Sequence, residues 1–232
     1  MPTDTPHTLT PIAHIRSDFP TKFGIPRQSG LVDSLRAAVI FTPPYRNPDA
    51  LRGIEDFSHL WLIWHFSACT EPGWSPTVRP PRLGGNRRVG VFASRSPFRP
   101  NALGLSCVRL LSVETTPDLG THLIVAGADL MDSTPIFDIK PYLPYSDSHP
   151  EATGGYIDAA PRRLLTVDFP PALLALVPED RREALTGVLS NDPRPSYQHD
   201  PERIYGLSFA GLNVQFQVEG EVLHVVSIGN EE

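Results

Sequence analysis

The sequence lacks most features that mark a secreted, membrane-spanning or metal-binding protein. Its only cysteines, Cys69 and Cys107, form neither a Cys-x-x-Cys motif nor a metal-ligand spacing, and His59 and His65 stand six residues apart, which matches no known metal spacing. No stretch approaches the ~20 apolar residues of a spanning helix. The opening MPTDTPHTLT has neither the basic segment nor the apolar run of a signal peptide. We therefore expect a cytoplasmic protein with no metal and no membrane partner.

Common nucleotide-binding and catalytic motifs are also absent. There is no G-x-x-x-x-G-K-[ST] segment, and no G-x-G-x-x-G sits between a strand and a helix. These absences argue against a P-loop and against an ordinary doubly wound dinucleotide fold. No G-x-S-x-G elbow marks Ser94, Ser96 or Ser106 as a nucleophile, so each is expected to have a structural or hydrogen-bonding role.

Acidic residues are missing from one long segment of an otherwise acidic chain. Residues 79–109 contain seven of the 20 Lys and Arg residues and no Asp or Glu, which leaves 13 basic residues against 26 acidic ones elsewhere. The net charge of -6 argues against a general coat of nucleic acid, but the segment predicts a localised anion-binding surface. All seven residues are arginines, which suit bidentate recognition of phosphate or carboxylate. The alternative is that individual arginines are solvated or pair with distant carboxylates.

Proline is abundant, with 26 residues in 232, about twice its usual ~5% share. The prolines stand in small groups, as loop punctuation, between short strand-like runs at residues 11–16, 36–41, 60–66, 89–93, 103–113 and 122–126. A short helix is expected over residues 49–57. Short strands without long helices between them predict an antiparallel sheet or barrel.

The pattern changes near residue 155, which is the expected domain boundary. Residues 163–169 are typical of a strand and residues 170–189 of a helix, and residues 212–218 and 222–228 predict a hairpin. We therefore expect a main domain over residues 1–155 and a smaller α+β domain over residues 156–232.

Three polar loops follow or precede the predicted strands. KFGIPRQSGLV carries Arg27 and Gln28, ASRSPFRPNALGL places Arg95 and Arg99 among prolines, and GADLMDSTPIFDIKPYLPY concentrates acidic residues, a lysine and two tyrosines. Loops of this kind at strand ends are typical of the rim of a small-molecule site. For the third loop the alternative is an Asp-Ser-Thr-Pro turn followed by an edge strand bounded by prolines.

Six segments are similar to motifs of a known family. They are GVFASRSPFRPNALGLS, DLMDSTPIFDIKPYLPYSDS, PRQSGL, FSHLWLIWHF, VRPPRLGG and, near the C-terminus, DPRPSYQHDPERIYGLSFAGLNVQFQV. Together they resemble the TsaA-like or TrmO family of tRNA methyltransferases, which act on N6-threonylcarbamoyladenosine. The resemblance spans nearly the whole chain.

The resemblance implies an S-adenosylmethionine-dependent enzyme, usually a homodimer, with a small antiparallel β-barrel and a smaller C-terminal domain. Such an enzyme would methylate the N6 nitrogen of the modified adenosine beside the anticodon of a threonine tRNA. Three positions depart from the family pattern, because Phe66 replaces a polar residue, Ala102 a proline and Ser133 a glycine. The positions that would hold the methyl donor are Pro26, Arg27, Gln28, His65, Phe66, Arg95, Leu105, Asp132, Ser133, Thr134 and Pro135.

The implied reaction assigns roles to further residues. The acceptor nitrogen must lose a proton, so a general base or a polarising donor would help, and the unranked candidates are Asp138, Lys140, Tyr142 and Tyr145. The candidates for RNA phosphates are Arg79, Arg82, Arg87, Arg88 and Arg99, with the partner subunit or its own loop as alternatives for Arg99. DPRPSYQ is a candidate contact to the anticodon loop, whose splayed bases are a usual target. Two other functions stay open: a non-catalytic nucleotide- or RNA-binding barrel, and a small-molecule methyltransferase whose arginines serve only the donor.

Overall fold

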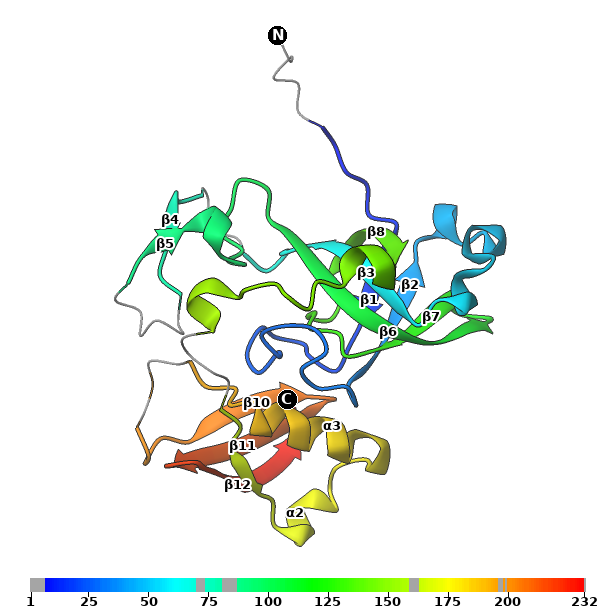
Figure 1. Cartoon of the computed structure of the whole chain (residues 1–232). Helices are drawn as coiled ribbons and strands as arrows, with labels where there is room; N and C mark the ends of the chain where they lie inside the picture. Colours follow the sequence, from blue (N-terminus) through cyan, green and yellow to red (C-terminus); the bar gives the residue numbers. More distant parts are fainter. Residues whose placement is uncertain are drawn as a thin grey trace.

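The computed structural model describes residues 7–69, 74–80, 87–158, 163–195, 198 and 200–231. Six antiparallel strands close into a barrel in the order β1-β2-β7-β6-β3-β8 (Figure 1). They are β1 (Ala13–Arg16), β2 (Arg36–Phe41), β3 (His59–His65), β6 (Leu103–Thr116), β7 (Gly120–Ala126) and β8 (Pro135–Pro141). The prediction of a mainly β fold is confirmed.

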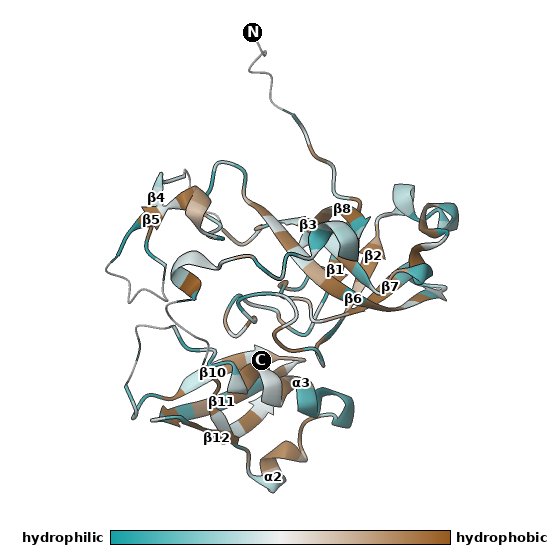
Figure 2. Ribbon diagram, in the orientation of Figure 1, coloured by the Kyte–Doolittle hydropathy of each residue, from teal (hydrophilic) through white to brown (hydrophobic). Residues whose placement is uncertain are grey.

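Alternation of apolar and polar residues gives the barrel its core. In β3 every second side chain is buried, as a strand with one face inward requires. Brown hydrophobic and teal hydrophilic stretches follow one another along the strands of Figure 2. The side chains that fill the barrel include Ala13, Ile15, Val39, Leu60, Leu62, Leu123, Val125 and Ile136, all at most 2% exposed.

Two sequence predictions in the first half differ from the structure. The run at residues 89–93 is a two-residue strand, β5 (Val89–Gly90), followed by the 3-10 turn η5 (Val91–Ala93), because Ser94 closes the turn by donating from its Oγ to the Val91 carbonyl at 2.8 Å. The expected helix at residues 49–57 is instead two 3-10 turns, η2 (Pro48–Leu51) and η3 (Ile54–Asp56). They are separated by Gly53, whose φ of 84° is incompatible with a continuing helix.

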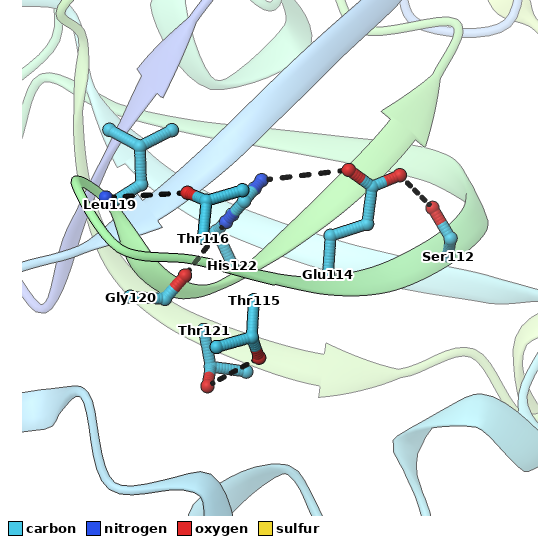
Figure 3. Close-up of polar contacts among 8 residues, drawn as sticks. All are labelled: Ser112, Glu114, Thr115, Thr116, Leu119, Gly120, Thr121 and His122. Atoms are coloured by element: carbon cyan, nitrogen blue, oxygen red, sulfur yellow. Dashed lines mark hydrogen bonds and ion pairs between the residues drawn. The ribbon is translucent and has the colours of Figure 1, made fainter.

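The β6–β7 hairpin extends beyond its predicted ends and has its own polar contacts (Figure 3). His122 is 3% exposed, its Nδ1 lies 3.0 Å from the Gly120 carbonyl oxygen, and its Nε2 lies 3.9 Å from Glu114 Oε2. Across the hairpin, the hydroxyls of Thr115 and Thr121 are 3.1 Å apart. The apolar pattern predicted that the first strand ends at residue 113 and that the second begins at residue 122. The polar contacts extend the pairing of both strands toward the turn.

The remaining short elements surround the barrel. Strand β4 (Thr77–Val78) pairs with β5 as a small two-stranded sheet. The others are η1 (Pro43–Tyr45), α1 (Pro144–Asp147) and η6 (Gly155–Ile157). Among the described helices, none is both long and apolar enough to cross a membrane.

A second sheet, in the order β10-β11-β12-β9, forms the lower part of Figure 1. Its strands are β9 (Thr166–Asp168), β10 (Tyr205–Phe209), β11 (Leu212–Glu219) and β12 (Val222–Asn230). The predicted hairpin is β11 and β12, but β10 was not predicted. The expected helix at residues 170–189 is instead two helices, α2 (Pro171–Leu174) and α3 (Glu179–Ser190). Pro178 stands between them, and a helix does not continue through it because proline has no backbone N–H and disfavours a helical conformation in the preceding residue.

The loop after β1 joins the two parts. Phe19, Val32 and Leu35 of this loop belong to the hydrophobic core of the second sheet, not to that of the barrel. The backbone N–H of Ala210 donates to the Asp18 carbonyl at 2.9 Å, and Arg181 Nε of α3 lies 2.9 Å from Asp18 Oδ2. Burial raises the pKa of Asp18, and the contact with Arg181 opposes this rise. The loop that carries Arg27 and Gln28 is therefore fixed by the C-terminal part.

We expect Arg181→Ala to lower the free energy of unfolding by roughly 1–3 kcal/mol, because it leaves the half-buried Asp18 carboxylate without its guanidinium. Chemical denaturation of the two proteins measures the difference. Arg163→Ala is the matched control, since Arg163 pairs with Glu221 at 3.9 Å while both side chains are more than 80% exposed. Equal stabilities of Arg181→Ala and wild type would contradict the importance of this ion pair.

Candidate functional site

The three polar loops identified in the sequence meet around one cavity of about 510 Å³. The first loop contributes Pro26, Arg27 and Gln28, the second contributes Arg95 and Arg99, and the third contributes Asp129, Met131 and Thr134. The end of β3, the residues after it and the start of β6 complete the wall. The volume falls in the ~300–1,000 Å³ range of small-molecule sites.

Eight of the eleven positions predicted to hold a methyl donor line this cavity. They are Pro26, Arg27, Gln28, His65, Phe66, Arg95, Leu105 and Thr134. Phe66 presents an aromatic ring there, 4.3 Å from the ring centre of Trp64. The structure thus brings together residues from four separate segments of the sequence.

The other three positions, Asp132, Ser133 and Pro135, build the turn behind Thr134. Asp132 Oδ1 accepts the backbone N–H of Ser17 at 2.9 Å, and its Oδ2 accepts the Ser133 hydroxyl at 2.9 Å. Ser133 has a φ of 63°, in the left-handed region where glycine is favoured. A glycine, as in the motif that this loop resembles, would adopt this φ without strain. The two hydrogen bonds give Asp132 a structural role, in agreement with the alternative interpretation of the loop as an Asp-Ser-Thr-Pro turn.

The arginines of the cavity are held by specific acceptors. Arg95 donates to Gln28 Oε1 and so links the first two loops. Arg27 donates to the backbone carbonyl of Arg194 at 3.2 Å, and Arg194 itself pairs with Asp192 at 2.8 Å. Arg99 donates to the carbonyls of Ser94 and Ser96 at 3.1 and 3.3 Å, so it serves the framework of its own loop.

Two side chains of the cavity wall, Trp64 and Asp129, are connected through the buried Ser106. Trp64 Nε1 donates to Ser106 Oγ at 2.9 Å, and Ser106 donates to Asp129 Oδ1 at 2.5 Å. Burial raises the pKa of the Asp129 carboxyl, although the Ser106 hydrogen bond and the charge of Arg95 act to lower it. Asp129 is one of the acidic residues of the third loop, but the sets of donor-binding and catalytic residues predicted from the sequence did not include it. Its place at the start of an acidic loop directly after a strand was the signal that could have identified it.

The four predicted catalytic residues do not line this cavity. In the β3–β8 register Asp138 pairs with Ile63 and Lys140 with Trp61, which puts them on the outward face of the barrel because Leu62 points inward. Lys140 Nζ lies 3.1 Å from Asp138 Oδ2. Tyr142 lies against the rings of Trp61 and His59, with centroid distances of 5.8 and 6.1 Å, and Tyr145 is 88% exposed.

A second hollow of about 1,050 Å³ shares Arg27, Gln28, Ser94, Arg95 and Pro97 with the first. Two of the predicted RNA-binding arginines, Arg79 and Arg88, line this hollow. The exposed aromatic residues Phe92 and Phe98 lie beside them. Arg87 is exposed nearby in the sequence, and Arg82 lies outside the described residues.

The charge of the first cavity is strongly asymmetric. Its described lining has four cationic side chains, Lys22, Arg27, Arg95 and Arg99, and a single carboxylate, Asp129. Within the part of the chain that the structure describes, no three His, Cys, Asp or Glu side chains gather as a metal site requires. The arrangement therefore fits an organic ligand with carboxylate or phosphate groups.

Comparison with known proteins adds the family context. The model of the tRNA-methyltransferase O N-terminal domain matches residues 14–148, and that of the TrmO C-terminal domain matches residues 162–231. The tRNA (adenine(37)-N6)-methyltransferase of Escherichia coli K12 is 44% identical over 215 residues, which cover 89% of this chain and 91% of that one. A candidate S-adenosylmethionine-dependent methyltransferase of Pseudomonas aeruginosa, RcsF, is 40% identical over 90% of this chain and 92% of that one. A crystal structure of TrmO from P. aeruginosa superimposes with a TM-score of 0.80 at 33% identity, covering 98% of each chain.

We expect Gly104→Ala to weaken ligand binding in the cavity and to lower the free energy of unfolding by roughly 1–3 kcal/mol. A Cβ at this position would overlap the indole ring of Trp64, which forms part of the wall. Gly90→Ala is the control, because a Cβ there meets open space. Thermal unfolding and calorimetric titration with S-adenosylmethionine measure both effects, and unchanged values for Gly104→Ala would show that the ring has room to move.

Proposed function

Because the chain belongs to the TrmO family of tRNA methyltransferases, we propose that it transfers the methyl group of S-adenosylmethionine to the N6 nitrogen of adenosine 37 in tRNA. We propose further that this adenosine already carries a threonylcarbamoyl group on N6 and belongs to a threonine tRNA. The observation that supports a threonylcarbamoylated substrate is the excess of positive charge in the 510 Å³ cavity.

The residues of the cavity fit the parts of the methyl donor. S-adenosylmethionine has a carboxylate, an ammonium, a sulfonium, a ribose and an adenine. Arg95 and Arg27 are suited to the carboxylate, and Phe66 and Leu105 offer apolar surface to the adenine. The Asp132 turn holds Thr134 in the wall, and because the Thr134 N–H and carbonyl are already bonded to Met131 and Ile15, its side-chain hydroxyl is the group suited to the ribose. The bound donor supplies the electrophilic methyl group, and these side chains position it.

The charge balance favours an anionic acceptor. The donor brings one carboxylate but also an ammonium and a sulfonium, so it adds a net positive charge to a cavity that already presents four cations and one acid. The threonyl part of N6-threonylcarbamoyladenosine brings a second carboxylate on the same side of the purine as the reacting nitrogen. An unmodified adenosine lacks this carboxylate and leaves the positive charge of the cavity less well balanced, which makes the binding free energy less favourable.

The second hollow is suited to the rest of the anticodon loop. Arg79 and Arg88 offer charge to backbone phosphates, and Phe92 and Phe98 offer faces on which unpaired bases stack. Arg87 and Arg82 extend the same basic segment, and Arg99 contributes through the loop that it holds. The proposal includes a cytoplasmic homodimer, for which sedimentation and fractionation are the tests.

The proposed substrate is tested by methyl transfer from labelled S-adenosylmethionine to threonine tRNA with and without the threonylcarbamoyl group. We expect N6-methylation of the modified tRNA and a kcat/KM at least ~10-fold lower for the unmodified one, because a hydrogen-bonded charge contributes about 1.5–3 kcal/mol. Mass spectrometry of the nucleosides identifies the product. Binding of both partners without transfer would instead support the non-catalytic barrel, and salt-insensitive, weak tRNA binding would support the small-molecule methyltransferase.

The role of Arg95 in donor binding is tested by calorimetry. We expect Arg95→Ala to weaken S-adenosylmethionine binding about 10- to 100-fold, since it removes a charged hydrogen-bond donor and the link to Gln28. Arg109→Ala is the control, because Arg109 lies in the same basic segment but lines neither hollow. An unchanged dissociation constant for Arg95→Ala would refute its assignment.

A further inference from the structure

The connected side chains Trp64, Ser106 and Asp129 form a directed hydrogen-bond relay. Ser106 is 1% exposed, and its oxygen accepts the proton of Trp64 Nε1. Because an indole N–H only donates, the Ser106 hydroxyl has its own proton to give, and it gives it to Asp129 Oδ1 at 2.5 Å. Asp129 therefore acts as an acceptor in this relay, with its carboxylate held in one orientation.

The backbone around Asp129 is fixed from outside its own strand. The N–H of Gly127 donates to the Leu35 carbonyl at 2.9 Å, and the Gly127 carbonyl accepts from Gly30 at 2.8 Å. The backbone of Ser29, in the same loop, also acts to lower the pKa of Asp129. The loop after β1, which packs into the core of the second sheet, thus holds the backbone next to Asp129 in place. A reacting group needs such a rigid support.

The charged surroundings of Asp129 keep the carboxylate usable as a base. Arg95 is the cation that acts on it directly and favours its ionised form. Burial has the larger and opposite effect, so the pKa of Asp129 lies above the ordinary aspartate range. A raised pKa makes a carboxylate a stronger proton acceptor than an exposed one. The other titratable residues of the cavity wall are Lys22, Arg27, His65, Cys69 and Arg99.

We propose that Asp129 is the general base of the methyl transfer and accepts the proton of the N6 nitrogen. The N6 lone pair forms the bond to the methyl carbon, the carbon–sulfur bond breaks, and its electron pair stays on the sulfur, which becomes neutral. The N6 proton passes to the Asp129 carboxylate and from there to water after product release. Ser106 and Trp64 are positioning residues, because they act only through Asp129. This inference rests on the proposed function and names a group within the same cavity.

The competing role for Asp129 is that of a counter-ion to the ammonium or sulfonium of the donor. The two roles differ in what they predict. A counter-ion contributes to donor affinity, whereas a base contributes to the rate of transfer from the fully bound complex and to its dependence on pH.

The test compares Asp129→Asn with wild type in single-turnover methyl transfer to threonylcarbamoylated threonine tRNA at saturating donor. We expect a ~10²–10⁴-fold lower rate, the usual contribution of a general base, and a donor dissociation constant within about 3-fold of wild type by calorimetry. Wild type should lose activity as the pH falls through the raised pKa of Asp129, above the ordinary value of ~3.9, and Asp129→Asn should lack this acid limb. Asp33→Asn, an exposed carboxylate outside the cavity, is the matched control.

A second variant, Ser106→Ala, keeps the carboxylate and removes the hydrogen bond that lowers its pKa. We expect its acid limb to move to higher pH, a shift that a purely structural defect would not cause. This readout decides the question if Asp129→Asn does not fold.

The outcomes distinguish a failure of the proposed function from a failure of the role assigned to Asp129. A wild-type protein that binds the donor and the modified tRNA but transfers no methyl group would overturn the proposed function, and the base with it. With an active wild type, a wild-type rate and pH profile for Asp129→Asn would overturn the role of Asp129 alone. The same holds if Asp129→Asn loses donor affinity but keeps its rate at saturation, or if the acid limb of Ser106→Ala does not move.

Discussion

Burial of Phe19, Val32 and Leu35 in the hydrophobic core of the second sheet is the packing interaction on which the site depends. These residues lie between barrel strands β1 and β2 in the sequence, but their side chains are buried against α3 and strands β10 to β12. The segment between them carries Lys22, Arg27 and Gln28 to the cavity. Arg27 also donates to the Arg194 carbonyl, so the C-terminal part supports a residue of the cavity wall from behind. The barrel alone would leave this loop without its anchor.

The cavity combines a rigid inner wall with a charged rim. Trp64 of β3 and Asp129 of the loop after β7 form part of the wall, and the buried Ser106 of β6 connects them by hydrogen bonds. Lys22, Arg95 and Arg99 supply charge at the rim, from loops stiffened by proline or by contacts to backbone carbonyls. Such preorganised charges stabilise a bound ligand more effectively than freely rotating ones, because their orientation is established before the ligand arrives.

The sequence predicted most strands of the barrel because each has an apolar face with a period of two residues. It failed where local chemistry overrode that pattern: Ser94 turned a strand into a 3-10 turn, Gly53 divided a helix, and Pro178 divided another. Strand β10 (Tyr205–Phe209) was missed although every second residue in it is buried, because it is short and follows a run of polar residues and prolines. The β6–β7 hairpin grew beyond its apolar run through pairs such as Thr115 and Thr121.

The order of the amino acids is enough to identify the three polar loops, the arginine-rich and acid-free segment, and the motifs of the family. Which of these side chains meet depends on the folded chain. Asp129 reaches the cavity, whereas Asp138 and Lys140, a few residues later, face outward because the register of β8 against β3 sets their direction. Arg95 joins Gln28 while Arg99 turns back on its own loop. The reason is physical: composition and spacing specify what a loop can bind, but side-chain direction follows from strand register and from contacts between residues far apart in the chain.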